Sequence, residues 1–194
     1  MENLILGRLQ EIVQIFPNFE DSCVKSIEKA AIIVAEAFGS GSKILICGNG
    51  GSAADAQHLA AEFVSTFASD ISRKALPAIA LTVDSSIITA YSNDFSFIDI
   101  FARQIEAYGK PGDVLIVLST SGKSKNCISA CIKAAELGLK IISFTRTSGV
   151  IAKNSDVAIE IPSLNTQHIQ EFHMISYHIL VELVENLLFR NSAK

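Results

Sequence analysis

The pair His58 and Glu62 is the first feature of the sequence that could do chemistry. The segment reads His58-Leu-Ala-Ala-Glu62, so a helix would place both side chains on one face. One imidazole and one carboxylate on a common face can bind a divalent cation or act as an acid and base pair. The same spacing is common in solvated surface pairs, so the spacing alone leaves both interpretations open.

A second group of candidate ligands lies near the end of the sequence. It holds Gln170, Glu171, His173 and His178, close to a further histidine at position 168. Gln170 and His178 are separated by about 12 Å along a helix, at 1.5 Å per residue. Binding one metal ion would require both side chains to lean inward, or different subunits to supply them. A histidine on an otherwise apolar helix is more often a packed core residue.

The glycine-rich segment Gly48-Asn-Gly-Gly-Ser52 follows a short apolar run and precedes a helical pattern. Glycines let backbone amides approach an anion closely, and Ser52 suits the N-cap of the following helix. A tight turn without a ligand is the alternative. The segment also fits G-x-G-x-x-A, but a dinucleotide site needs an acid about 20 residues further on. The nearest acid after the next strand is Asp84, which is too late, so we expect no nucleotide cofactor.

A second turn, Ser119-Thr-Ser-Gly-Lys-Ser124, is rich in hydroxyl groups. Hydroxyls and amides at a helix N-terminus can surround a phosphate without a charged partner. The segment is not a P-loop, because Val117 stands where the first glycine of that motif belongs. An ordinary capped helix is the alternative. Two turns of this kind in one domain favour a phosphorylated small molecule as ligand.

The elements that must position these residues alternate between strand and helix. Short apolar runs predict buried parallel strands at 43–47, 78–81, 113–118, 140–144 and 157–161. Helical patterns cover 53–67, 85–92, 97–108, 124–137 and 168–189. Two further helices, 4–16 and 20–39, are separated by Pro17, and we expect them to form an N-terminal hairpin. The alternation predicts a three-layer α/β fold with right-handed crossovers.

The composition limits the classes of protein that remain. The chain has 194 residues, 49% of them hydrophobic and 19% charged, with a net charge of −4. We therefore expect one folded domain, no nucleic-acid partner, and some apolar surface that meets another subunit. The sequence has neither a signal-peptide pattern nor an uncharged apolar run long enough to span a membrane. Cysteines at 23, 47, 127 and 131 form no C-x-x-C pair, which favours reduced thiols in a cytoplasmic protein over a cysteine zinc site.

Four blocks of the sequence resemble one known family. They are Cys47 to Phe63, Asn93-Asp94-Phe95, Ser119 to Ser124, and Ile169-Gln-Glu-Phe-His173. In order and spacing they are similar to the phosphoheptose isomerases, a family of sugar-isomerase (SIS) domain proteins, over nearly the whole chain. The resemblance implies a single SIS domain over 1–194, with a helical part at 1–39 and an α/β core at 40–194. It also implies a flavodoxin-like five-stranded parallel sheet and a homotetramer with active sites at subunit interfaces.

The resemblance further implies an activity and a set of functional residues. The reaction is the interconversion of sedoheptulose 7-phosphate and D-glycero-D-manno-heptose 7-phosphate through an enediol, for bacterial lipopolysaccharide or other surface polysaccharide. The implied roles are catalysis by Glu62 as base and His178 as acid. The implied zinc ligands are His58, Glu62, Gln170 and His178. The implied substrate contacts are Asn49, Gly50, Gly51, Ser52, Glu62, Asn93, Asp94, Ser119, Thr120, Ser121, Ser124 and Gln170.

The sequence departs from the family pattern at three places. Thr66 and His168 stand where the family usually has arginine, and Arg146-Thr-Ser-Gly149 replaces a glycine-rich stretch. Contacts to the sugar or phosphate are expected to differ there. An alternative is a related, non-enzymatic SIS-domain regulator that binds the replication initiator DnaA. That relative is expected to lack the histidine at position 178, which this chain retains together with His58 and Glu62.

Overall fold

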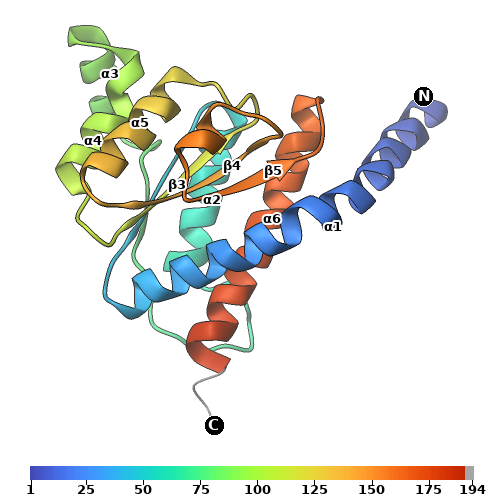
Figure 1. Ribbon diagram of the computed structural model, residues 1–194, viewed down its shortest axis with the longest axis horizontal. Coiled ribbons are helices and arrows are strands. Elements are labelled where there is room, and N and C mark those ends of the chain that lie inside the picture. The colour runs from blue at the N-terminus through green and yellow to red at the C-terminus, as the bar shows by residue number, and fades with distance from the viewer. Residues whose placement is uncertain (191–194) are drawn as a thin grey trace.

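The fold is built around one parallel sheet, seen in the computed structural model, which describes residues 1–190 (Figure 1). The strands lie in the order β2-β1-β3-β4-β5 and all pair in parallel. This is the strand order of flavodoxin-like folds and confirms the predicted fold class. The strands are β1 (Ile44–Gly48), β2 (Ala78–Ala80), β3 (Val114–Ser119), β4 (Lys140–Arg146) and β5 (Val157–Ile161).

Helices cover both faces of the sheet, which explains why β1 and β3 are buried at every position. One core lies between the sheet and the helices α1 (Glu2–Gly39), α2 (Gly51–Val64) and α6 (Thr166–Glu185). The core on the opposite face holds residues of α4 (Ile100–Tyr108) and α5 (Lys125–Glu136), with α3 (Ser85–Asp94) packed at its edge. Two short 3₁₀ helices, Phe97–Asp99 and Ile151–Asn154, and a π turn, Asn186–Arg190, complete the described chain.

The prediction of an N-terminal helical hairpin is wrong. Residues 2–39 form the single helix α1, with Pro17 inside it. Proline removes one backbone hydrogen bond, to the carbonyl of Val13, but a long helix tolerates it by bending. Figure 1 shows that α1 changes direction part-way along its length. Pro17 and Val13 are both exposed, so water can reach the backbone at the bend.

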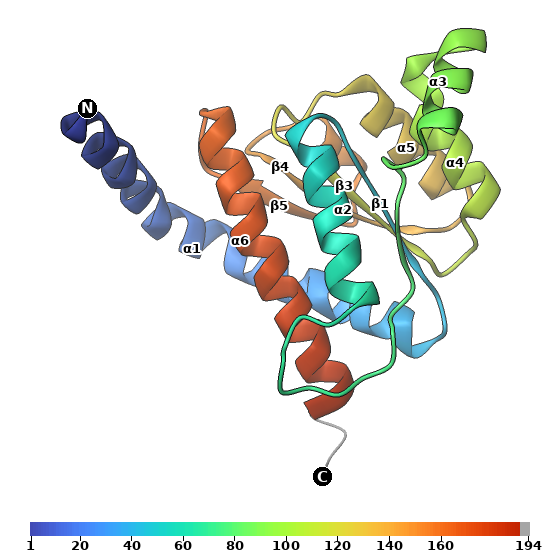
Figure 2. The same cartoon turned by 180° about the vertical axis from the view of Figure 1, so that it is seen from behind.

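The second half of α1 packs on the sheet, and the N-terminal turns project from it (Figure 2). Between them, Arg8 and Glu11 contact His168 of α6, and the ring of Phe16 packs on that of Phe172.

No helix within residues 1–190 combines the length and the apolar character that crossing a membrane requires.

Candidate functional site

The glycine-rich turn forms where β1 passes into α2. The helix starts at Gly51 with Gly50 as its N-cap, so the expectation that Ser52 is the cap was wrong. Gly50 has φ +57°, which glycine adopts without strain, and this lets the helix begin before the serine. At Gly48 a side chain would lie 2.6 Å from the carbonyl oxygen of Ser52. The turn therefore requires glycine at position 48 for close backbone packing and at position 50 for the backbone conformation that starts α2.

Three of the predicted ligands come together between α2 and α6. His58 Nε2 lies 2.9 Å from Glu62 Oε1, as expected for residues on one helical face. The rings of His58 and His178 have centroids 5.1 Å apart, and one ligand atom from each of His58, Glu62 and His178 lies within 4.8 Å of the others. All three residues are partly buried, so the group is open to a small ligand. An imidazole, a carboxylate and a second imidazole form a donor set that suits zinc.

Gln170 takes a different place from the other three. Its side-chain nitrogen donates to Asp55 Oδ2 at 3.0 Å, near the start of α2. A Cβ atom added to Gly51 would lie 2.4 Å from the same nitrogen, so Gln170 packs directly on the glycine-rich turn. Gln170 thus links the turn to α6, and the described contacts place it beside Asp55.

Asp55 and Tyr177 are functional candidates that the sequence analysis missed. The hydroxyl of Tyr177 lies 3.0 Å from His58 Nδ1 and fixes that ring from the side opposite Glu62. Burial raises the pKa of Asp55, and burial together with the charges of Asp55 and Glu62 raises the pKa of Tyr177. Asp55 lies three residues before His58 and so on the same helical face, and this spacing could have indicated Asp55 as a site residue. Tyr177 reaches His58 from α6, and nothing in the sequence indicated that contact.

His178 is held in its neutral form. Burial, and then the nearby His58, lowers the pKa of its imidazole. At neutral pH one ring nitrogen therefore carries a proton and the other is free. Such a ring can donate a hydrogen bond to a substrate oxygen or coordinate a metal ion.

The hydroxyl-rich turn joins β3 to α5. Ser119 and Ser124 face one another, with their Oγ atoms 3.3 Å apart, and the Oγ of Ser121 accepts the backbone N–H of Lys123 at 3.3 Å. Ser124 is the N-cap residue of α5, so the turn lies at a helix N-terminus. Thr120 and Ser124 are half-buried and Ser121 is exposed. Hydroxyls and amides thus converge as an anion site requires.

The remaining predicted contacts lie outside these two clusters. The side-chain amides of Asn49 and Asn126 exchange two hydrogen bonds, of 2.9 and 2.8 Å, which turns Asn49 toward α5. Asn93 donates to Asp94 at 2.8 Å, and both are exposed at the end of α3. Figures 1 and 2 show α3 at the corner of the domain away from α6. Within residues 1–190, neither Asn93 nor Asp94 is hydrogen-bonded to His58, Glu62 or His178.

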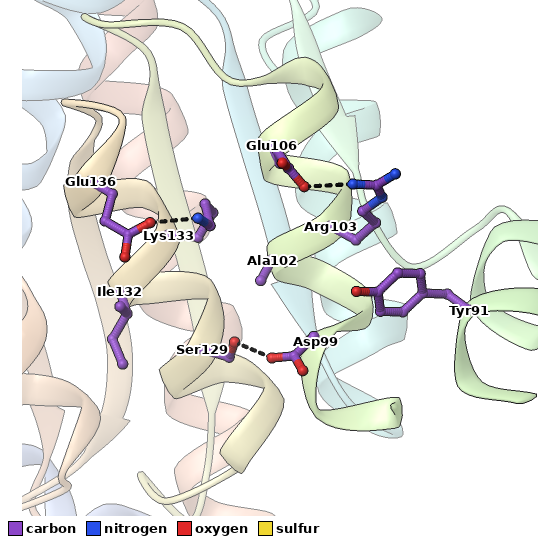
Figure 3. A pocket seen from close by; sticks show the side chains of 9 residues that line it. All are labelled: Tyr91, Asp99, Ala102, Arg103, Glu106, Ser129, Ile132, Lys133 and Glu136. Carbon is purple, nitrogen blue, oxygen red and sulfur yellow. Dashed lines mark hydrogen bonds and ion pairs between the residues drawn. The ribbon is translucent and has the colours of Figure 1, made fainter. Parts of the chain in front are cut away.

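Two surface hollows differ in what they offer. An open, largely apolar cavity of about 570 Å³ lies between α1 and α6 and is lined by residues that include Ile12, Gln170 and His178. The pocket in Figure 3, of about 250 Å³, lies between α4 and α5. Its polar groups satisfy one another through Arg103–Glu106, Lys133–Glu136 and Ser129–Asp99 contacts. Of these two, the hollow between α1 and α6 contains residues of the candidate site, and Ser121 of the hydroxyl-rich turn lines a third hollow.

Comparison with known proteins gives one consistent family. The SIS domain family matches residues 9–146. A phosphoheptose isomerase of Clostridium acetobutylicum is 45% identical over 192 residues, covering 97% of each chain. A phosphoheptose isomerase of Roseiflexus is 51% identical over 157 residues, covering 80% of this chain and 79% of its own.

Solved structures agree with the sequence comparison. The phosphoheptose isomerase of Neisseria gonorrhoeae superposes with a TM-score of 0.89 at 35% identity, covering 95% of this chain and 98% of its own. The phosphoheptose isomerase of Francisella tularensis gives a TM-score of 0.90 at 34% identity, covering 95% and 97%. The fold, including the long first helix, is therefore shared with these structures.

Proposed function

Because this chain belongs to the phosphoheptose isomerase family of SIS domain proteins, we propose that it interconverts sedoheptulose 7-phosphate and D-glycero-D-manno-heptose 7-phosphate. The single observation that carries the proposal is the convergence of Glu62, His58 and His178 between α2 and α6. A carboxylate and an imidazole at one place are the groups that an aldose–ketose isomerisation needs.

The reaction moves a proton between C1 and C2 of the sugar. The Glu62 carboxylate takes the proton from the carbon that bears the hydroxyl, which gives an enediol, and returns it to the neighbouring carbon. His178 donates a proton to the carbonyl oxygen and accepts one from the hydroxyl, relaying the charge between the two oxygens. The lowered pKa of His178 keeps the ring neutral, so its N–H nitrogen can donate a proton and then regain one, while the second nitrogen stays available to a metal ion.

The phosphate end of the substrate needs only to be held in place. The facing hydroxyls of Ser119 and Ser124 and the N-terminus of α5 support binding of the phosphate there. Binding at this remote group would orient C1 and C2 toward the His58 group and so lower the entropy cost of reaction. Gln170, packed on Gly51, would separate the two parts of the site.

Zinc is the cofactor that the donor set fits. His58, Glu62 and His178 would hold it, with Gln170 as the fourth ligand once its amide turns from Asp55. When bound, the ion would polarise the substrate oxygens and stabilise the negative charge of the enediolate. An amide oxygen is a poor zinc ligand, so we expect modest affinity.

The biological setting follows from the same proposal. A homotetramer would cover the apolar surface of α1, and the free, buried cysteines at 23, 47, 127 and 131 fit a reducing cytoplasm. The product would supply heptose for lipopolysaccharide or another surface polysaccharide. The assembled His58 group favours an enzyme over the regulator that binds DnaA, since a regulator has no need of a base beside an acid.

The direct test is incubation of the purified protein with sedoheptulose 7-phosphate in deuterated water, followed by NMR. We expect formation of the heptose 7-phosphate with deuterium at the carbon that receives the proton, because an enediol exchanges protons with solvent. Absence of both product and deuterium, in protein that is folded and supplied with zinc, would contradict the proposal.

A further inference from the structure

Arg73 and Glu185 form a buried ion pair at the opposite end of α2 from the glycine-rich turn. Arg73 Nε lies 2.6 Å from Glu185 Oε1, and both side chains are fully buried. The pair is remote from the expected phosphate site. A fully buried ion pair contributes little net stability compared with apolar residues of similar size. Its contacts therefore need an explanation other than charge attraction.

The guanidinium of Arg73 binds the end of α2 at the peptide group of Glu62 itself. Nη2 donates to the carbonyl oxygen of Glu62 at 2.7 Å, and Nη1 donates to the carbonyl oxygen of Phe63 at 2.8 Å. The last carbonyls of a helix lack partners within the helix. Arg73 thus caps the turn of α2 that carries the predicted catalytic base and restrains its backbone.

The carboxylate of Glu185 fixes the same structure to α6. It accepts the backbone N–H groups of Phe67 and Ala68 at 3.1 and 3.0 Å, in addition to Arg73. Glu185 follows His178 by two helical turns, so the two residues lie on the same face of α6. The ion pair therefore connects the backbone at Glu62 with the helix that presents His178.

We propose that Arg73 and Glu185 are positioning residues that hold the carboxylate of Glu62 in register with His58 and His178. Neither residue contacts the substrate in this proposal, which rests on the proposed isomerase function. The reacting groups lie on two different helices, and a displacement of about 1 Å in such a site can lower a rate about 100-fold. The planar guanidinium of Arg73 donates to three backbone carbonyls and a carboxylate at once, a geometry that lysine cannot reproduce.

The test is Arg73→Lys, which keeps the charge and removes the fork. We expect kcat to fall by about 10-fold or more while KM changes by less than about threefold, because the phosphate site is remote. The matched control is Arg190→Gln, which breaks the exposed Arg190–Asp70 pair of 2.7 Å between the same two segments. The control should behave as the parent. Equal loss of kcat in both variants would overturn the proposal, as would a folded Arg73→Lys protein with the parental kcat.

A second measurement does not depend on turnover. In protein with ¹⁵N-labelled histidine, the ring signals of His58 report its 2.9 Å hydrogen bond to Glu62. We expect them to move in Arg73→Lys and to stay in Arg190→Gln. If the parent proves inactive on sedoheptulose 7-phosphate, the proposed function fails, and unchanged His58 signals in Arg73→Lys would separately overturn the positioning role.

Replacing both charged residues, Arg73 and Glu185, distinguishes a positioning role from a purely structural one. If Arg73→Lys does not fold, Arg73→Met with Glu185→Leu removes the charges together and avoids a stranded buried ion. In folded protein we expect this double variant to show the same loss of kcat and the same shift of the His58 signals. Parental values for both would overturn the proposal and leave the pair as packing alone.

Discussion

The chemistry of each candidate residue depends on what surrounds it. Glu62 has a histidine as its hydrogen-bond partner, and that histidine is held in turn by Tyr177. His178 is kept neutral by burial and by His58, so it is suited to exchange a proton with an oxygen near neutral pH. These contacts would orient the proposed base, metal ligand and acid with few side chains.

Removing either proton-transfer group should abolish most activity. We expect Glu62→Gln and His178→Gln each to lower kcat by about 100-fold or more, the usual scale for a general acid or base. Both proteins should unfold at temperatures close to the parent, because the substitutions roughly preserve size in a partly open site. Steady-state kinetics and thermal unfolding measure the two effects, with Glu182→Gln on the exposed face of α6 as control. Parental turnover in His178→Gln, with a lower Tm, would show that this histidine merely packs.

His173 should make the fold sensitive to acid. It is fully buried, and burial lowers its pKa to about 3, although the nearby backbone of Thr145 opposes that shift. The unfolded chain binds a proton near pH 6.5, so stability falls as the pH drops below that value, by roughly 1.4 kcal/mol per unit for this group. His173→Phe should remove that part of the slope in urea unfolding between pH 6.5 and 4. The same slope in both proteins would show that other groups cause the acid sensitivity.

At the scale of elements, the sheet could be predicted and the first helix could not. The strands are short apolar runs bounded by turns. The central strands β1 and β3 are the most continuously apolar, and they are buried at every position. Pro17 normally ends a helix, and the sequence gives no sign that exposure at Val13 and Pro17 lets α1 continue with a bend. Contacts of α1 with β5 and α6 on both sides of the bend, among them Phe16 and Phe19 against Phe172, favour the continuous helix.

In the site, too, some residues could be predicted from the sequence and others could not. His58 and Glu62 share a helical face, and the two turns follow strands, so local patterns indicated them. Arg73 and Tyr177 contact α2 from other elements. Arg73 donates to the backbone carbonyl of Glu62, and the hydroxyl of Tyr177 contacts the ring of His58. Contacts of this kind depend on how α2 and α6 pack, which no short-range spacing encodes.

The hydroxyl-rich turn between β3 and α5 should bind the phosphate. We expect Ser121→Ala and Ser124→Ala to raise KM by about 10- to 100-fold, since a hydrogen bond to a charged group is worth roughly 1.5–3 kcal/mol. Melting temperatures should change little, because Ser121 is exposed and the Oγ contact of Ser124 is long. Ser22→Ala, on the exposed face of α1, serves as the control in the same kinetic assay. Parental KM values in both variants would place the phosphate elsewhere.

At the scale of the whole molecule, one surface is unlike that of a stable monomer. The N-terminal half of α1 exposes Ile5, Leu9 and Val13 by 61%, 55% and 66%, at a spacing of four that puts them in one stripe. Isolated exposed apolar residues are common, but a continuous stripe marks an interaction surface. The cavity between α1 and α6 is open on the same half of the helix and includes His178. Association of copies through α1 and α6 would cover the stripe and enclose the site.

Charge placed on this stripe should therefore dissociate the protein. We expect the parent to be a homotetramer and Leu9→Asp with Val13→Asp to give smaller species, because each substitution puts a carboxylate where apolar contact is required. Gln10→Asp with Gln14→Asp adds the same charge at the same spacing on exposed positions of α1 outside the stripe, and should remain tetrameric. Multi-angle light scattering gives the masses, and activity at equal protein concentration shows whether assembly completes the site.

The dissociated variant should lose activity together with mass, since the cavity at His178 then opens to water. A parent that is monomeric and fully active would contradict the proposed assembly.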